Sequence, residues 1–276
     1  MKAKQEKTHD IRPGQSVELL KELHILTRDG RMNQDSRRKL KQVYHLFNFI
    51  EPLLAEARQA HADVHLVDHG AGKSYLGFIL YDLFFKERAP ASTVWGIETR
   101  DELVARSHAL AERLGFAGMR FLNLSAADAV VSPALPERVD VVTALHACNT
   151  ATDDAIRFAL AKKAKYVVLV PCCQAEVAAT LRKHKATALA DALGEVWRHP
   201  IHTREFGSHL TNVLRCLRLQ AHGYDVTVTE LTGWEHSLKN ELIVAVDRQL
   251  PTRKPAERLA ELLATFGLEE LRERFA

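Results

Sequence analysis

Cysteine is scarce in this chain, with four among 276 residues. Two of them, Cys172 and Cys173, are adjacent, which suits reduced thiols in a cytoplasmic protein better than a disulfide framework. Long hydrophobic runs are also missing. The most apolar stretch, residues 75–85, is short and contains Asp82, so we expect no membrane span. The first ten residues are polar and lysine-rich, which argues against a secretory signal.

An excess of one charge sign is absent as well. The 38 Lys and Arg residues against 35 Asp and Glu residues give a net charge of +3. This balance alone does not indicate a nucleic-acid partner, for which a local basic cluster would be needed. Hydrophobic residues make up 46% and charged residues 26% of the chain, which excludes a wholly disordered or fibrous protein.

The pattern of apolar residues divides the chain into three parts. Residues 1–62 hold no convincing strand, and their apolar spacing predicts a helical N-terminal extension with a helix over 36–60. We expect this extension to contact the substrate. Residues 63–250 alternate short Val- and Ile-rich runs with helical stretches, which is typical of a parallel sheet covered on both faces. Residues 251–276 predict amphipathic helices. The strands are expected at 64–68, 93–98, 119–124, 139–145, 166–170, 224–231 and 241–247. The helices between them are expected at 73–86, 101–114, 152–161, 175–193 and 210–221.

The last two predicted strands are separated by residues 232–240 alone. This connection is too short for a helical crossover, so we expect the two strands to pair antiparallel.

A glycine turn follows the first predicted strand. Gly70 and Gly72 stand between that strand and the next helix, where glycine permits positive φ and lets a ligand approach the backbone. The helix presents free N–H groups at the same place. Glu98 ends the second strand, where a carboxylate can accept the hydroxyl hydrogens of a ribose. The pattern predicts a nucleoside-binding site at the carboxyl ends of the strands.

Other ligands fit this turn less well. Gly72-Lys73-Ser74 matches the end of a Walker A motif, but Val67 stands where that motif needs its first glycine. The dinucleotide fingerprint needs a third glycine where Tyr75 stands. An alternative remains open, in which the turn needs glycine for its backbone geometry alone and binds no ligand.

The Asp-x-Gly-x-Gly segment, with an acidic residue ending the next strand, resembles motifs I and II of class I S-adenosylmethionine-dependent methyltransferases. The resemblance implies a Rossmann-like α/β fold with a seven-stranded, mostly parallel sheet whose last strand is antiparallel. It also implies S-adenosyl-L-methionine as the cofactor. The residues that it places around the cofactor are Asp68, Gly70, Gly72, Tyr75, Glu98, Leu124, Ser125 and His146.

Polar segments follow the fourth and fifth predicted strands, where open α/β sheets bind ligands. The segments Leu-His-Ala-Cys-x-x-Ala-Thr-Asp and Pro-Cys-Cys resemble a methyltransferase branch that includes tRNA ribose methyltransferases and proteins with a glutathione S-transferase C-terminal domain. We expect Asn149 and Asp153 to hold the methyl acceptor, and His146 or Asp153 to act as base if the acceptor is a ribose hydroxyl. The candidate catalytic residues are His146, Asn149, Asp153, Cys172 and Gln174.

The cysteines after the fifth strand allow other interpretations. Adjacent cysteines in extended backbone point to opposite faces, so Cys172 and Cys173 are not expected to bind a metal ion together. A Pro-Cys segment also carries the attacking cysteine of cytosine C5-methyltransferases, where it follows the fourth strand instead of the fifth. A cysteine that packs inward as a small apolar residue remains open.

Two basic clusters favour RNA, either ribosomal or transfer RNA, as the methyl acceptor. One lies near the N-terminus and the other around residues 182–204, each with aromatic side chains nearby that suit base stacking. We also expect residues 236–240 to contact the acceptor and residues 200–210 to form a lid. The candidate substrate residues are Arg37, Arg38, Lys41, Arg182, Lys239 and Asn240, and the aromatic candidates are Tyr44, Phe47, Trp197 and Phe206. A small-molecule or protein methyltransferase, or a non-catalytic binding module with this fold, remains open.

Overall fold

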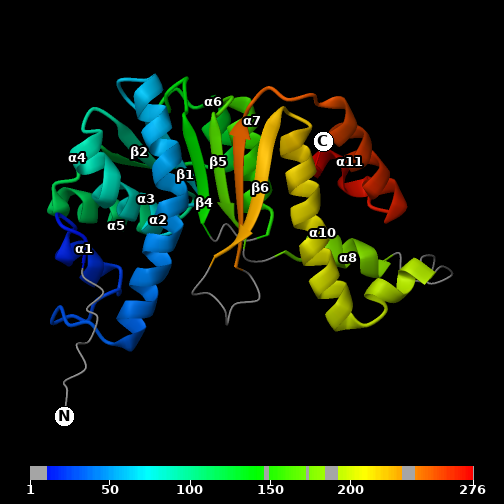
Figure 1. The fold of residues 1–276 in the computed structure, drawn as a ribbon, viewed down its shortest axis with the longest axis horizontal. Coiled ribbons are helices and arrows are strands. Elements are labelled where there is room, and N and C mark those ends of the chain that lie inside the picture. The colour runs from blue at the N-terminus through cyan, green and yellow to red at the C-terminus, as the bar shows by residue number, and fades with distance from the viewer. Residues whose placement is uncertain (1–10, 146–148, 172–173, 184–191, 232–239, 276) are drawn as a thin grey trace, which may run out of the picture.

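The computed structural model describes residues 11–145, 149–171, 174–183, 192–231 and 240–275. One sheet with helices on both faces forms its centre (Figure 1). The strand order is β3-β2-β1-β4-β5-β7-β6. Six strands run parallel, and β7 lies antiparallel between β5 and β6. This is the predicted Rossmann-like arrangement, with a helical N-terminal extension. The strands are β1 His65–His69, β2 Thr93–Glu98, β3 Met119–Asn123, β4 Val141–Leu145, β5 Tyr166–Val170, β6 Tyr224–Glu230 and β7 Glu241–Asp247.

The helices also follow the predicted order, with two short ones that the sequence did not indicate, α1 and α6. None of the helices within the described ranges has the length and apolar character that a membrane span needs. In chain order they are α1 Val17–Glu22, α2 Gln34–Ala60, α3 Tyr75–Leu80, η1 Tyr81–Phe85, α4 Lys86–Arg88, α5 Asp101–Leu114, α6 Ala126–Val131, α7 Ala151–Ala161, α8 Glu176–Lys183, η2 Ala192–Trp197, α10 Pro200–Gln220, α11 Arg253–Thr265, η3 Glu269–Leu271 and α12 Arg272–Phe275.

Two hydrophobic cores cover the two faces of the sheet. The alternation of side chains along β1 sends Leu66 to the face covered by α2, α3 and α5, and Val67 to the face covered by α6 and α7. A third core forms beside the sheet, where α8, η2 and α10 pack against the C-terminal helices around Trp197, Leu214 and Leu263. The amphipathic C-terminal helices thus bury their apolar side against α10.

The N-terminal extension is fixed to the helix that follows the glycine turn. The buried carboxylate of Asp82 accepts a hydrogen bond from the Ser16 amide at 2.9 Å and pairs with Lys86 at 2.7 Å. Lys86 also donates to the Gly14 carbonyl at 2.6 Å. These contacts fix the segment before α1 to η1 and the start of α4. The N-terminal half of α2 extends past the carboxyl edge of the parallel strands (Figure 1).

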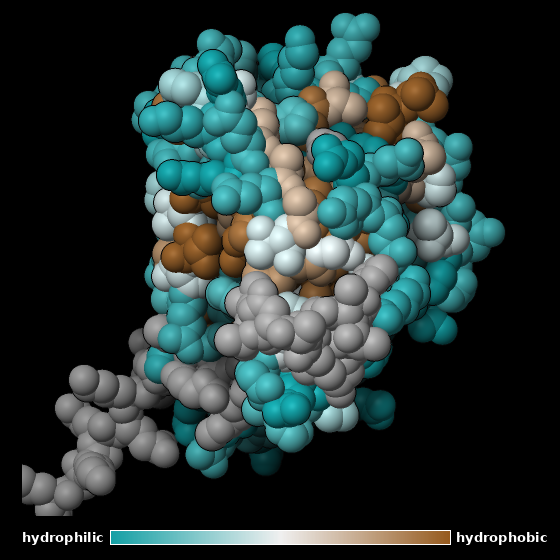
Figure 2. Space-filling view, turned by 90° about the vertical axis from the view of Figure 1, so that its right-hand side faces the viewer, coloured by the Kyte–Doolittle hydropathy of each residue, from teal (hydrophilic) through white to brown (hydrophobic). Residues whose placement is uncertain are grey.

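The surface on the side of α10, α11 and β6 is mostly hydrophilic. Its apolar parts are small patches between polar side chains (Figure 2). The large apolar side chains exposed in this half of the chain, Val196, Ile201, Val228 and Leu250, belong to four different segments. This scatter is normal for a protein surface.

The predicted lid over residues 200–210 is wrong. These residues form the first half of α10, which begins at Pro200, a favourable first helical residue. Gly207 lets α10 approach α8, because a Cβ atom there would lie 2.7 Å from the Cβ of Ala178. This close contact fixes the segment in the third core.

The predicted base-stacking role of the aromatic residues is also wrong. Trp197 is buried and stacks on Phe206 with ring centroids 5.6 Å apart. Phe47 is buried in the core beneath α2. Tyr44 is half-buried, and its hydroxyl donates to Gln15 at 2.6 Å. All four side chains serve packing within the protein.

We expect Gly207→Ala to lower the free energy of unfolding by about 1–3 kcal/mol, because the added methyl group overpacks the contact with α8. Helix propensity alone predicts the opposite sign, a gain of about 1 kcal/mol. Urea unfolding of the variant measures the difference. The neighbouring change Ser208→Ala is the control and should stay within about 0.5 kcal/mol of the parent. A Gly207→Ala protein more stable than the parent would contradict the close packing of α10 on α8.

Candidate cofactor and acceptor site

The turn after β1 has the backbone that its glycines predict. Gly70 and Gly72 have φ values of 65° and 58°, in the left-handed region. A Cβ atom on residue 72 would meet nothing closer than 3.9 Å. Glycine is therefore favoured at this position by the positive φ and not by crowding from a neighbouring side chain. Ser74 also has positive φ, at 50°, immediately before α3. The turn therefore presents bare backbone at the carboxyl end of β1.

Glu98 lies directly beside this turn. Its Oε2 accepts a hydrogen bond from the Gly72 amide at 2.8 Å, and its Oε1 accepts from the Arg100 amide at 3.1 Å and the Arg100 Nε at 3.0 Å. Burial alone would raise the pKa of Glu98, but the bonds from Arg100 and Gly72 hold it below its usual value. Glu98 is therefore a carboxylate at the tip of β2, as expected.

Asp68 is buried at the end of β1, with 2% of its surface exposed. Its Oδ1 accepts a hydrogen bond from the Thr143 hydroxyl at 2.8 Å. Burial raises the pKa of Asp68 to about 7, although bonds from Thr143 and the Gly77 backbone oppose the rise. Asp68 can therefore gain or lose a proton near neutral pH when a charged group approaches.

A cavity of about 420 Å³ opens between the glycine turn, the tip of β4 and α2. Asp68 and Tyr75, both expected at the cofactor, line it, and burial raises the pKa of the Tyr75 hydroxyl. The remaining lining residues are Leu23, Lys39, Gln42, Val43, Leu46, Ala71, Lys73, Leu76 and Leu145. Four of these belong to α2, so the N-terminal extension forms one wall of the cavity.

Leu124 and Ser125 lie just past the tip of β3, next to Glu98. The Leu124 amide donates to the Glu98 carbonyl at 3.3 Å. Ser125 caps α6, because its hydroxyl accepts from the Asp128 amide at 3.2 Å. The structure therefore brings these two residues to the same edge as Glu98.

Asn149 lies against the segment that contains Gln174, as their places after β4 and β5 predict. The Asn149 side chain is exposed, and its Oδ1 accepts from the Ala175 amide at 3.4 Å. The Gln174 Oε1 accepts from the Glu176 amide at 2.7 Å. The Gln174 Nε2 is buried and has no hydrogen-bond partner among the described residues. Two side-chain amides thus stand together at the carboxyl edge.

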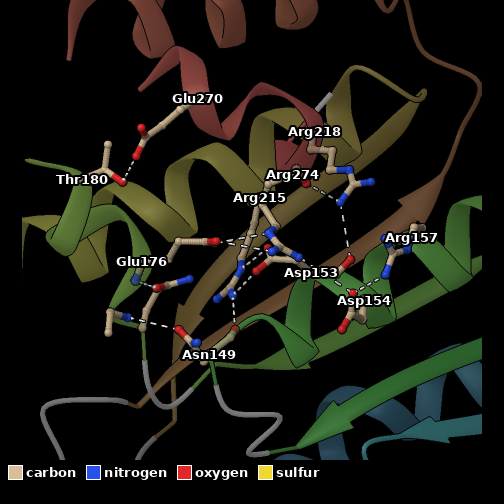
Figure 3. Close-up of polar contacts among 12 residues, drawn as sticks. Asn149, Asp153, Asp154, Arg157, Glu176, Thr180, Arg215, Arg218, Glu270 and Arg274 are labelled. Carbon is tan, nitrogen blue, oxygen red and sulfur yellow. Dashed lines mark hydrogen bonds and ion pairs between the residues drawn. The ribbon is translucent and has the colours of Figure 1, made fainter. Parts of the chain in front are cut away.

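Asp153 does not reach this edge, and its predicted contact with an acceptor is wrong. Both of its carboxylate oxygens accept from Arg215 of α10, each at 2.8 Å, with 1% of its side chain exposed (Figure 3). Both oxygens are thus occupied by a two-point contact inside the protein, and neither is directed at an acceptor. Asp153 is therefore part of the scaffold behind the acceptor segment.

Of the substrate candidates, Arg38 and Lys41 are exposed on α2, and Arg37 is half-buried there. Arg182 is exposed at the far end of α8. Asn240 lies before β7 and donates to Glu230. Three predicted residues, His146, Cys172 and Lys239, lie outside the described residues.

Sequence reasoning missed the α2 residues that line the cavity. Lys39, Gln42, Val43 and Leu46 recur at i, i+3, i+4 and i+7, so helical spacing could have placed them on one face. Lys73 lay within the predicted glycine turn but was not assigned a role. No signal in the sequence pointed to Arg215. In the described part of the chain, no three His, Cys, Asp or Glu side chains come together in a way that could hold a metal ion.

Comparisons with known proteins give one family match and a sequence relative. A family model described as "Methyltransferase domain" matches residues 38–180. A mouse (Mus musculus) protein, "Glutathione S-transferase C-terminal domain-containing protein", is 24% identical over 242 residues. The match covers 80% of this chain and 35% of the mouse protein, so the chain spans about a third of that relative.

Several solved structures show a more distant likeness. A magnesium protoporphyrin IX methyltransferase from Synechocystis is 12% identical with a TM-score of 0.45, covering 83% of this chain and 92% of that one. Fibrillarin from Aeropyrum pernix is 14% identical with a TM-score of 0.41, covering 66% of each chain. Likenesses of this degree do not indicate a shared substrate.

We expect the raised pKa of Asp68 to make Asp68→Asn change how stability depends on pH. Below pH 3.8, its ordinary pKa, the Asp68 side chain is neutral in both the folded and the unfolded protein. Above about pH 7 it is charged in both, although it is buried in the folded protein. Wild-type stability should therefore fall from pH 4 to pH 8 by about 4 kcal/mol relative to the uncharged variant.

Urea unfolding at pH 4.5, 6 and 8 measures this difference. Asp63→Asn is the control, because a hydrogen bond from Arg138 holds the pKa of Asp63 below its usual value. That contribution is present at neutral pH and disappears as the pH falls, so the control should show the opposite sign. A constant difference between wild type and Asp68→Asn at all three pH values would contradict the assignment of Asp68.

Proposed function

We propose that this chain, which belongs to the methyltransferase domain family, binds S-adenosyl-L-methionine at the tips of β1 and β2 and methylates RNA. The observation that carries the cofactor assignment is the contact of Glu98 with the Gly72 amide, at 2.8 Å. It brings a carboxylate for ribose hydroxyls and a bare glycine turn to one place. When bound, the cofactor would supply a methyl group on a sulfonium, which is already electrophilic.

Glu98 can bind the ribose by exchanging partners. Its two oxygens are now held by Arg100, whose side chain is 59% exposed and free to turn into solvent. Ribose hydroxyls would replace the bonds from Arg100, while the Gly72 amide keeps the carboxylate in place. Each charge-assisted bond of this kind contributes about 1.5–3 kcal/mol.

Asp68 and the cavity beside it suit the amino-acid end of the cofactor. An ammonium group close to Asp68 would favour the charged carboxylate and lower its raised pKa. Binding would then release a proton near pH 7. The wall formed by α2 closes the other side of this cavity and limits access of water to the reacting atoms.

Asn149 and Gln174 are the best-placed residues to hold the acceptor. The buried Gln174 Nε2 has no described partner, and an unsatisfied buried donor is costly unless a ligand atom accepts its hydrogen bond. Holding the acceptor in line with the methyl group can lower the barrier by about 7–11 kcal/mol. A ring nitrogen needs no base, whereas a ribose hydroxyl would need one, and His146 remains the candidate.

The charge around the carboxyl edge supports RNA as the acceptor. Arg38 and Lys41 are exposed on α2 next to Lys39, which lines the cavity. Arg182 lies on α8, on the opposite side of the carboxyl edge (Figure 1). Basic side chains on both sides of the edge could contact phosphates on either side of a target nucleotide.

A small anionic acceptor is the second candidate. Several basic side chains of the second cluster are already paired with acids, such as Arg198 with Glu195 and Arg204 with Glu205. The cavity is mainly apolar, with Lys39 and Lys73 in its lining. A small apolar acid would fit such a lining.

We expect Glu98→Ala to weaken S-adenosyl-L-methionine binding by at least tenfold, because two charge-assisted bonds to the ribose are lost. Calorimetric titration of the purified protein measures the affinity. Glu102→Ala, an exposed carboxylate on the first turn of α5, is the matched control and should bind as the wild type does. An unchanged affinity in both Glu98→Ala and Asp68→Ala would reject the cofactor assignment.

The acceptor is tested by methyl transfer from labelled cofactor to total RNA or to a small-molecule extract, both from cells that lack the protein. We expect label in the RNA, with transfer decreasing steeply as salt increases. Asn149→Ala should reduce transfer at least tenfold while cofactor affinity stays within twofold. Label in the extract alone would favour the small-molecule acceptor.

A further inference from the structure

Arg215 of α10 is the largest fully buried side chain in the described part of the protein, with no exposed surface. Its Nε and Nη2 donate to the two carboxylate oxygens of Asp153, each at 2.8 Å. Figure 3 shows the guanidinium between α10 and the start of α7. Such a two-point contact fixes the orientation of both side chains.

The same guanidinium contacts the acceptor segment directly. Arg215 Nη2 also donates to the backbone carbonyl of Asn149 at 2.9 Å (Figure 3). Asn149 has a φ of 53°, a left-handed conformation that asparagine adopts more readily than other residues with a side chain but that is still uncommon. Arg215 supplies a contact that holds it.

A second series of hydrogen bonds connects Arg215 to the start of β7. Its Nη1 donates to the Asn212 Oδ1 at 3.1 Å, and the Asn212 Nδ2 donates to Glu241 at 2.8 Å. Glu241 begins β7, and because β7 is antiparallel, its first residue lies at the carboxyl edge of the other strands. One buried cation thus joins the connections before α7 and before β7.

We propose that Arg215 is a positioning residue that sets the backbone of Asn149 for acceptor binding, an inference that rests on the proposed function of this edge. A contribution to stability does not explain the Arg215–Asp153 ion pair well, since apolar residues can often replace a buried ion pair without lowering the free energy of unfolding. Orientation gives a stronger reason, because three of its contacts converge on the segment 149–153. Arg215 lies outside residues 38–180, so the clamp on the acceptor segment comes from beyond the matched family region.

The test uses the double variant Arg215→Leu/Asp153→Leu, which removes both charges and leaves neither one buried without a partner. Arg215→Lys is the conservative variant, since it keeps the charge but cannot make the two-point contact. Arg157→Leu is the matched control, because Arg157 pairs with Asp154 on the same helix and its side chain is 53% exposed. The measurements are the melting temperature, cofactor affinity, hydrogen exchange of residues 149–156 and methyl transfer to RNA.

In the double variant we expect the melting temperature to stay within a few degrees and cofactor affinity within twofold of the wild type. Hydrogen exchange in 149–156 should be at least tenfold faster, with β1 to β3 unchanged. The turnover number for RNA should fall at least tenfold, more than KM rises. Arg215→Lys should give intermediate values, and the control should match the wild type.

Unchanged exchange and turnover in the double variant would overturn the inference, because Arg215 would then be replaceable core. Loss of both cofactor affinity and turnover would also overturn the inference, since Arg215 would then stabilise the fold as a whole and not position Asn149 specifically. A wild-type protein that binds cofactor but labels no RNA would reject the proposed acceptor. Faster exchange in the double variant would still support the positioning of Asn149 in that case.

Discussion

The hydrogen bond between the Gly72 amide and the Glu98 carboxylate joins the tips of two neighbouring strands. The remaining parts of the candidate site are arranged around this contact. It is made from the turn after β1, where Gly72 has positive φ. It also requires β1 and β2 to end in register, which their parallel pairing ensures, with Asp68 opposite Gly96 and His69 opposite Ile97. The meeting of the glycine turn with Glu98 is thus a direct result of sheet geometry.

Segments from outside the central sheet complete the site on both sides. On one side, α2 supplies a wall of the cavity and basic side chains next to it. On the other side, α10 holds the loop after β4 through Arg215 and packs against α8 through Gly207. The C-terminal helices contact both α8 and α10, since Arg274 pairs with Glu176 at the start of α8 and its carbonyl accepts a hydrogen bond from Arg218 of α10 (Figure 3). The segments that follow β4 and β5 therefore depend on packing at some distance from them.

Sequence reasoning predicted the sheet well because a buried parallel strand leaves a local signal. The run Tyr166–Val170 consists of apolar residues and is buried throughout, and β4 is mostly apolar and almost fully buried as well. The places of Glu98 and the glycines were also predictable, because they follow from strand ends and φ angles. These features depend on residues that are close in the sequence.

The predictions for other features were wrong because these features depend on partners that are distant in the sequence. Asp153 follows a strand as a binding carboxylate would, yet its partner is Arg215, which lies 62 residues later. Residues 200–210 are polar enough to suggest a loop, yet their few apolar side chains and Gly207 fit the surface of α8. The aromatic residues near the basic clusters belong to cores that only the tertiary structure reveals.

The anchoring of the extension at Asp82 affects how the protein can be divided. A cut near residue 62, just before the first strand, looks natural because the α/β pattern begins there. Such a cut would remove Ser16 and leave the Asp82 carboxylate buried with Lys86 as its remaining partner. It would also open the cavity to solvent along its whole α2 side. The unit that has to be kept intact therefore includes Gly14 and Ser16 and does not begin at the first strand.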